Sequence, residues 1–104
     1  MQTIPNSKKA PSNDLRIHYC PACGWMLRAS WLAQEILSTF NNEVSSVSLV
    51  PAREEAGLFE IWVNQNRVWC RKQDQGFPQP KELKQRIRDL ICPDRRLGHS
   101  DKKA

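Results

Sequence analysis

Apolar and polar residues follow two different periods along the chain, and these periods predict six elements in the order β-α-β-β-β-α. Stretches in which every second residue is apolar, such as LRIHY, are typical of strands with one buried face. Stretches in which apolar residues recur every three or four positions are typical of amphipathic helices. The sequence predicts strands at 15–19, 44–50, 58–64 and 67–72 and helices at 21–41 and 80–91.

The order of these elements predicts how they pack. A strand–helix–strand unit of this length favours a parallel strand pair with a right-handed crossover. Each predicted strand has one apolar and one polar face, whereas the strands of a sheet covered on both sides are almost continuously apolar. We therefore expect an α/β (α+β) fold of thioredoxin-like type, with a four-stranded mixed sheet and both helices on one face.

The last two strands are predicted to form a hairpin with Gln65-Asn66 at its turn. That turn would set Trp62 opposite Trp69 and place Cys70 on the apolar face as a small core residue. On the uncovered face the two tryptophans would form either a homodimer or partner surface, or a simple cross-strand contact. A third tryptophan, Trp31, lies off the apolar stripe of the first helix and would pack against nearby loops or help to bind a partner thiol.

Composition and charge limit the kinds of partner that the chain is expected to have. Residues 1–14 and 93–104 are rich in polar residues and predict disordered tails around a single folded domain at 15–92. More than half of the net charge of +5 lies in these tails, so the sequence does not predict a nucleic-acid-binding face. No apolar stretch is long enough to span a membrane and no secretory signal is evident, so we expect a cytoplasmic protein that does not bind membranes.

The motif Cys20-Pro-Ala-Cys23 lies where the first strand is predicted to feed the first helix, with Pro21 in the first helical turn. Two cysteines at this spacing in a cytosolic protein are typical of a redox couple. The start of a helix stabilises an anion and can lower the pKa of a cysteine toward neutrality, which makes thiolate abundant. From this placement we expect Cys20, just before the helix, to be the more exposed thiolate and Cys23 to resolve a mixed disulfide.

Zinc binding and an inert pair are the competing interpretations of the motif. A closed structural zinc site needs four ligands, and the remaining cysteines, Cys70 and Cys92, are isolated in the sequence. His18 is predicted to face away from Cys70, on the opposite side of the sheet. It shares a strand face with Cys20, so it would either tune that thiolate or lie on the solvent face as an ordinary histidine.

Three segments give the chain a resemblance to a known family: YCPACGWMLRASWLAQEIL, GLFEIWVNQNRVWCRK and GFPQPKELKQRIRDLI. They resemble the Rdx family, which includes selenoproteins T, W and H, in its selenoprotein W-like bacterial branch. The resemblance implies a thioredoxin-like fold and a thiol-based redox role, often described as linked to glutathione. In the selenoprotein members, selenocysteine occupies the position matched by Cys23, so the resemblance implies reactivity at Cys23 as well as at Cys20. Thioredoxins carry a cis-proline beside the motif, but the matching stretch EEAGLF has none, and we expect backbone near Gly57 to take its place.

The sequence thus predicts a small thiol–disulfide redox protein in which Cys20 and Cys23 cycle between dithiol and disulfide. It predicts no bound cofactor, with glutathione or a thiol/disulfide protein as the reaction partner. A redox-sensitive interaction module that does not turn over is the second interpretation, and a zinc-binding module is the third.

Overall fold

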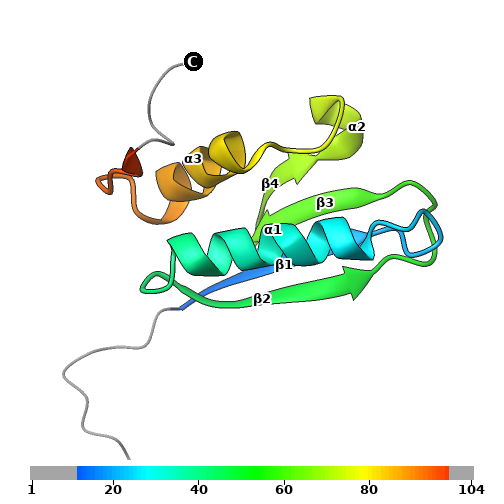
Figure 1. Cartoon of the computed structure of the whole chain (residues 1–104), viewed down its shortest axis with the longest axis horizontal. Coiled ribbons are helices and arrows are strands. Elements are labelled where there is room, and N and C mark those ends of the chain that lie inside the picture. The colour runs from blue at the N-terminus through cyan, green and yellow to red at the C-terminus, as the bar shows by residue number, and fades with distance from the viewer. Residues whose placement is uncertain (1–11, 99–104) are drawn as a thin grey trace, which may run out of the picture.

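A computed structural model describes residues 12–98 of the 104-residue chain (Figure 1). The predicted order of strands and helices is confirmed, with one short helix added after the last strand. The elements are β1 (Asn13–Tyr19), α1 (Met26–Thr39), β2 (Val44–Pro51), β3 (Phe59–Val63), β4 (Asn66–Cys70), α2 (Arg71–Asp74) and α3 (Pro80–Ile91).

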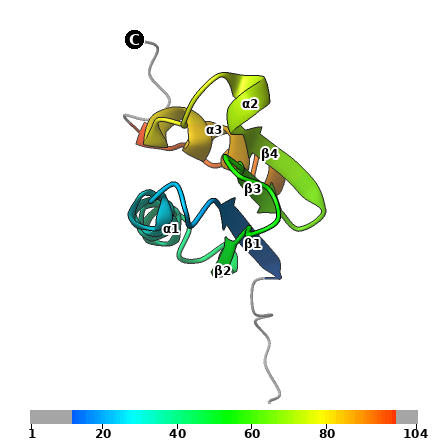
Figure 2. The ribbon, with the colours of Figure 1, turned by 90° about the vertical axis from the view of Figure 1, so that its right-hand side faces the viewer.

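The four strands form one mixed sheet in the order β2-β1-β3-β4. β1 pairs in parallel with β2 and antiparallel with β3, and β3 pairs antiparallel with β4. Both long helices lie on the same side of this sheet, which Figure 2 shows from one end. The predicted thioredoxin-like α+β fold, with one sheet face uncovered by helices, is therefore confirmed.

The core lies between the sheet and the two long helices. β1 and β3 alternate as predicted, with every second residue buried and the residues between them half-exposed or exposed. An ion pair of 2.8 Å between Lys84 and Glu35 joins α3 to α1 at the margin of the core. The core side chains that are fully buried include Leu15, Ile17, Leu32, Ile36, Phe40, Phe59, Ile61, Val63, Leu83 and Ile87.

The register of the β3–β4 hairpin differs from the prediction. Trp62 lies opposite Arg67 and Ile61 lies opposite Trp69, so Val68 is an extra residue in β4. Such a bulge reverses the alternation of the strand beyond it, because neighbouring residues point to opposite faces. The predicted pairing of Trp62 with Trp69 is wrong: Trp69 is buried in the core, and its Nε1 donates a 2.9 Å hydrogen bond to the Gly76 carbonyl.

The bulge also moves Cys70 away from its predicted position. Cys70 lies opposite Glu60 rather than Ile61, on the side of the sheet to which His18 and Glu60 belong. The prediction that His18 and Cys70 face opposite sides is therefore wrong. Cys70 is nevertheless buried, as expected.

The ordered unit is longer than the predicted domain at both ends. β1 begins at Asn13, and past Cys92 the chain packs back on the fold through Leu97 and a 2.8 Å ion pair between Arg95 and Glu43. Residues 1–11 and 99–104 of the predicted tails lie outside the described residues. None of the helices in residues 12–98 is long and apolar enough to cross a membrane.

Candidate functional site

The cysteine motif forms a turn between β1 and α1 rather than the first turn of the helix. Residues 21–24 are a turn closed by a 3.1 Å hydrogen bond from the Gly24 amide to the Pro21 carbonyl. Gly24 has a φ of 77°, a conformation that glycine adopts without the strain that a Cβ would cause. Helix α1 begins only at Met26, so the prediction that Pro21 lies in the first helical turn is wrong.

Cys20 and Cys23 are joined by a disulfide, and their Cα atoms lie 5.3 Å apart. This separation is within the range that a disulfide requires. The two cysteines differ strongly in exposure: Cys20 is 1% exposed at the end of β1, whereas Cys23 is exposed on the turn. The prediction that Cys20 is the more exposed of the two is therefore wrong, because the turn, and not the helix, carries Cys23 to the surface.

The start of α1 is left free to interact with an anion on this turn. Its N-cap residue, Trp25, makes no side-chain capping bond, and the first turn of the helix contains no acidic residue. The amides of a first helical turn have no partner within the helix and carry the positive end of its dipole. A thiolate two or three residues before such a helix start is stabilised relative to the neutral thiol.

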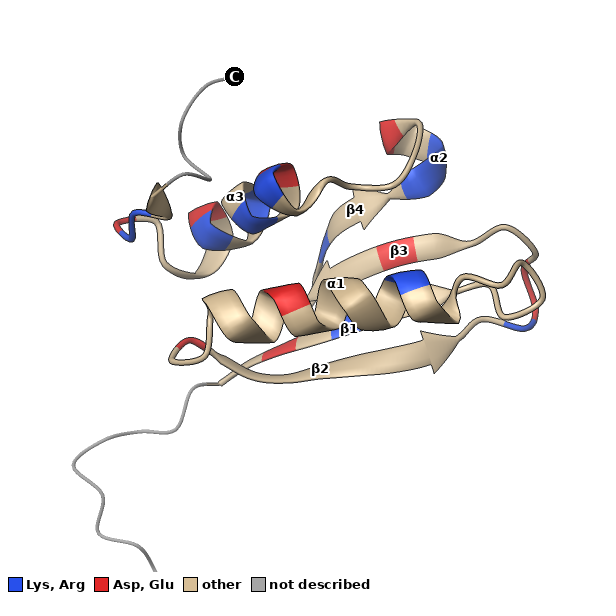
Figure 3. Ribbon diagram, viewed as in Figure 1, with Lys and Arg blue, Asp and Glu red and all other residues tan. Residues whose placement is uncertain are grey.

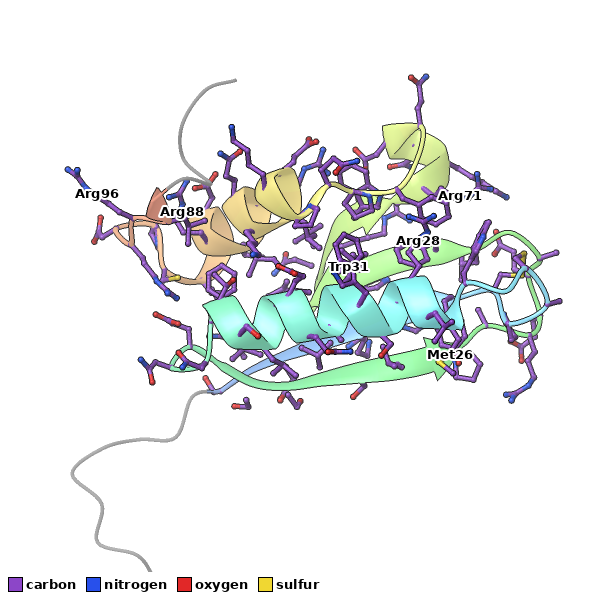
Figure 4. All side chains as sticks on the ribbon, in the orientation of Figure 1. Met26, Arg28, Trp31, Arg71, Arg88 and Arg96 are labelled. Carbon is purple, nitrogen blue, oxygen red and sulfur yellow. A yellow bond between two sulfur atoms is a disulfide. The ribbon has the colours of Figure 1, made fainter. Side chains whose placement is uncertain are left out.

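Three aromatic rings and two arginines form a wall beside the motif. Trp25, Phe59 and Phe77 meet edge to face, with ring centroids 4.9 to 6.3 Å apart. The guanidinium of Arg28 lies 4.1 Å above the Phe77 ring, and that of Arg71 lies 5.0 Å above the Trp25 ring. Figure 4 shows both arginines on the side of α1 that faces α2 and α3.

No role at the motif was predicted from the sequence for Phe77, Arg28 or Arg71, which come from three separate segments. The signal that could have found Phe77 is local: it is the one aromatic residue in the polar stretch QDQGFPQ. Arg28 and Arg71 carry no such signal, since a surface arginine is common in any helix or loop.

The backbone near Gly57 is occupied by Arg71. The Nε and Nη2 atoms of Arg71 each donate a 3.2 Å hydrogen bond to the Gly57 carbonyl. Gly57 has a φ of 80°, and a Cβ at this position would come within 3.4 Å of Arg71 Nη2. The arginine therefore anchors the loop before β3 to the wall beside the motif.

His18 lies on the uncovered face of the sheet, where its partners are polar side chains of that face. Its Nε2 accepts a 3.4 Å hydrogen bond from Arg16 Nε, and it lies opposite Glu60 in the neighbouring strand. Burial lowers the pKa of His18, and the positive charge of Arg16 lowers it further, against the opposing effect of Glu60. The ring is therefore neutral at pH 7, and its role in tuning Cys20 stays a prediction.

The tryptophans proposed as a partner surface do not form one patch. Trp62 is half-buried on the uncovered face, where its Nε1 donates a 3.1 Å hydrogen bond to Glu60 and Arg16 lies 5.5 Å from its ring. Trp69 is on the other side of the sheet, in the core. Trp31 is 44% exposed on the flank of α1 toward α3, whereas Met26 lies on the flank toward β2 (Figure 4). A partner surface at Trp31 stays a prediction, whereas a paired surface of Trp62 and Trp69 is excluded.

The two remaining cysteines are free thiols, and both differ from the motif in their surroundings. Cys70 is buried at the end of β4. Burial raises the pKa of the Cys92 thiol, and Glu43 raises it further, against the opposing charges of Arg95 and Arg88. Within residues 12–98, no three His, Cys, Asp or Glu side chains form a group that could hold a metal ion.

The exposed part of the motif, residues 21–24, lies outside two hollows of the fold. One hollow, of about 200 Å³, is lined by residues of β3, β4, α2 and the loop before β3. The other, of about 380 Å³, lies between β4 and α3. Neither is lined by Cys20 or Cys23. The disulfide is therefore reached through the exposed Cys23 and not through either hollow.

Comparisons with known proteins agree with this architecture. A crystal structure of a selenoprotein W-related protein from Vibrio cholerae is 51% identical, with a TM-score of 0.73 over 76% of this chain and 96% of that one. A crystal structure of a protein from Bordetella parapertussis is 47% identical, with a TM-score of 0.72 over 76% of this chain and 98% of that one. No curated protein matches the chain. The model of the Rdx family matches residues 14–89, and the chain therefore belongs to the Rdx family.

Proposed function

We propose that this protein is a thiol–disulfide redox protein in which Cys23 attacks and Cys20 resolves. The observation that carries the proposal is the contrast between the two bonded cysteines, one exposed on a turn and the other 1% exposed. The sulfur that can be reached from solvent is the one that can enter a mixed disulfide. Membership of the Rdx family supports a redox-related role. The match of Cys23 to the selenocysteine position of the selenoprotein members supports the same assignment.

In the reductive direction, the Cys23 thiolate attacks one sulfur of a substrate disulfide R–S–S–R′. The substrate S–S bond breaks, R′S⁻ leaves and takes up a proton, and Cys23 is left in a mixed disulfide with RS. The Cys20 thiol then loses its proton and attacks Cys23 Sγ, so that RS⁻ leaves and the Cys20–Cys23 disulfide forms. Two electrons pass from the protein dithiol to the substrate, and a thiol reductant such as glutathione returns them, itself oxidised to glutathione disulfide.

The surroundings of the motif support each step. The uncapped start of α1 stabilises the Cys23 thiolate in the first step. When the Cys20–Cys23 disulfide is later reduced, it stabilises the thiolate that is released there in the same way. The small ring closed by Cys20 and Cys23 keeps the resolving sulfur next to the attacked one. The wall of Trp25 and Phe77 with Arg28 offers apolar surface and positive charge to the group bonded to Cys23.

The experiment that tests the proposal uses glutathione disulfide as the probe and maps the adducts by mass spectrometry. In a Cys20→Ser variant, glutathione should stay on Cys23, because no thiol is placed to release it. In a Cys23→Ser variant, adduct formation at Cys20 should be at least about tenfold slower, since that sulfur is buried. A Cys92→Ser variant should behave as the unmodified protein does. Adducts on Cys70 or Cys92 alone, or equally fast trapping at Cys20, would contradict the proposal.

A second candidate function is a redox-sensitive interaction module that does not turn over. The observation in its favour is the exposed apolar surface at the start of α1, next to the motif, where Leu27 is 77% and Met26 47% exposed. A protein docked there would sense whether the turn is oxidised. Catalytic reduction of a disulfide substrate, lost in both single-cysteine variants, supports the redox protein; a measurable redox potential without turnover supports the module.

A further inference from the structure

The sheet has two outer strands, and only one of them has a protected edge. β4 is five residues long, Arg86 Nη1 donates a 2.8 Å hydrogen bond to its Val68 carbonyl, and Asp74 accepts a 2.9 Å hydrogen bond from its Cys70 amide. Natural proteins protect sheet edges in this way, with short strands and covering charged side chains. β2 is eight residues long and reads VSSVSLVP, without any charged residue. Figure 3 shows β2 uncharged along its full length.

The backbone of β2 presents hydrogen-bonding groups at that unprotected edge. Within the part of the chain that the structure describes, β2 is the outermost strand and pairs with β1 alone. The Ala52 amide donates to the Tyr19 carbonyl of β1 at 2.7 Å. Because the backbone groups of neighbouring strand residues point to opposite edges, the amides and carbonyls of Val47 and Leu49 point away from β1. Proline removes an outward amide only at Pro51, the last residue of the strand.

An uncharged strip of α1 runs beside this edge. Leu49, on the helix side of β2, is 36% exposed, because α1 does not cover it fully. On α1, Met26 is 47% and Leu37 is 40% exposed. Eleven helical residues make about three turns, so these two side chains lie on the same flank roughly 16 Å apart. Figure 4 shows Met26 on the flank toward β2.

The charged residues of α1 lie on its opposite flank. Glu35 pairs with Lys84 of α3, and Arg28 stacks on Phe77 before α3. Within residues 12–98, the flank along β2 therefore combines outward-pointing backbone groups at Val47 and Leu49, exposed apolar side chains and no charged side chain. Lone exposed apolar residues are ordinary, but their alignment along an unprotected strand edge is a feature of strand-to-strand association.

We propose that β2 pairs antiparallel with β2 of a second copy and extends the sheet through a homodimer. The sequence of β2 is self-complementary in this arrangement. A two-fold axis at Ser48 places Val47 of each copy opposite Leu49 of the other. Each such pair would form two backbone hydrogen bonds, one in each direction. The same axis brings the Met26 end of one α1 to the Leu37 end of the other. A second copy also fits the charge, since neither side of this edge carries a like charge that would repel its counterpart.

This dimer leaves the cysteine motif open. The motif lies at the Pro51 end of β2, because Tyr19 pairs with Pro51. In an antiparallel arrangement the two motifs lie at opposite ends of the joined sheet, and neither is covered. The dimer therefore does not depend on the proposed redox function and can be tested apart from it.

The test measures the oligomeric state of the full chain by sedimentation velocity over a concentration series. We expect a dimer, and a Leu49→Lys variant should raise its dissociation constant by about tenfold or more, because it puts two like charges at the seam. The matched control is Leu90→Lys, a leucine of similar exposure (44%) on α3, which should leave the dissociation constant unchanged. A monomer at every concentration overturns the proposal. Equal weakening by both substitutions also overturns it.

A cross-link gives an independent measurement that does not depend on charge. In a Cys92→Ser background, Ser48→Cys should form a disulfide between two copies on mild oxidation, because residues on the axis lie within the Cα separation that a disulfide needs. Ser38→Cys, on the exposed side of α1, is the control and should stay uncross-linked. Equal cross-linking at both positions overturns the proposed register and edge.

Discussion

Two strands of the sheet run into a buried cysteine, and the residues that follow differ completely in their interactions. Cys20 after β1 is 1% exposed and Cys70 at the end of β4 is 8% exposed. After Cys20 the chain makes an exposed turn with a second cysteine, then a helix whose start has no side-chain cap. After Cys70 the chain enters α2, and the Cys70 amide is held by Asp74, which Arg86 binds at 3.1 Å.

Burial of a cysteine therefore does not by itself decide what its thiol can do. Both sulfurs are shielded, but only the first has an exposed neighbour through which electrons can reach it. At the second, Arg86 also donates to Val68 and stacks 4.4 Å from the Trp69 ring, so the strand end is fastened by one side chain. One strand end leads to an exposed cysteine, and the other is held by the side chains of Asp74 and Arg86.

The largest expected effect is on thiol reactivity. In the fully reduced protein, Cys23 should be alkylated at least about a hundredfold faster than Cys70, because Cys23 is exposed on a turn whereas Cys70 is only 8% exposed. The measurement is the rate of labelling by iodoacetamide at each site, followed by mass spectrometry of peptides. Comparable rates at the two sites would remove the distinction between the two strand ends.

The second effect is on stability at the β4 end. Arg86→Met should lower the free energy of unfolding by about 2 to 3 kcal/mol, because it leaves the Asp74 carboxylate and the Val68 carbonyl without their partner. Lys72→Met, which removes a 3.5 Å ion pair with Glu55 between side chains that are both more than half exposed, should cost less than about 1 kcal/mol. Urea denaturation measures both. If the two variants lose equal stability, Arg86 has no special role at this strand end.

The third effect concerns Asp74 and pH. Burial alone raises the pKa of Asp74, but the hydrogen bonds from Arg86 and from the Cys70 amide outweigh it, and the pKa lies below 3.8. The folded state therefore holds this proton less tightly than the unfolded state does. The resulting stabilisation is present above pH 3.8 and is lost as the pH falls through the lower folded value.

We expect Asp74→Asn to cost about 1 to 2 kcal/mol at pH 7 and less at acid pH. Urea denaturation at pH 7 and at pH 3 measures the difference. A cost that is equal at both pH values would show that the charge of the Asp74 carboxylate contributes nothing to the free energy of unfolding.

The smallest effect is at His18, two residues before Cys20. Burial and Arg16 hold the pKa of His18 below 6.5, so the unfolded state takes up a proton first as the pH falls. Stability should therefore decrease as the pH is lowered through 6.5, by less than about 1 kcal/mol, and His18→Gln should remove this decrease. Thermal melts at pH 7.5 and 5.5 measure it. If the variant instead changes the pH profile of Cys23 labelling, His18 tunes the motif.

The sequence alone predicted most of the framework, because its signals are local. The alternation of Leu15, Ile17 and Tyr19 depends only on one strand having one buried face, and β1 follows it. The stripe that includes Ala29, Leu32 and Ile36 likewise depends only on helical spacing, although Leu37 at its margin is 40% exposed because no second layer covers that flank.

The register of the β3–β4 hairpin could not be predicted from local sequence patterns. Nothing in NQNRVWC marks Val68 as the extra residue, and a simple turn at Gln65-Asn66 fits the apolar pattern equally well. The bulge becomes favourable only because it turns Trp69 into the core. There the Gly76 carbonyl accepts a hydrogen bond from Trp69 Nε1, and Arg86 stacks on the Trp69 ring. Those partners come from segments that follow the hairpin, so the register depends on tertiary contacts.

Local patterns in the sequence are enough to predict a thioredoxin-like α+β domain with the Cys20–Cys23 motif between its first strand and first helix. Spacing and periodicity depend only on residues that are close together in the chain. The burial of Cys20, the exposure of Cys23 and the contact of Arg71 with the loop at Gly57 depend instead on tertiary packing. Exposure and contacts depend on what the rest of the chain packs against, and no pattern within the motif carries that information.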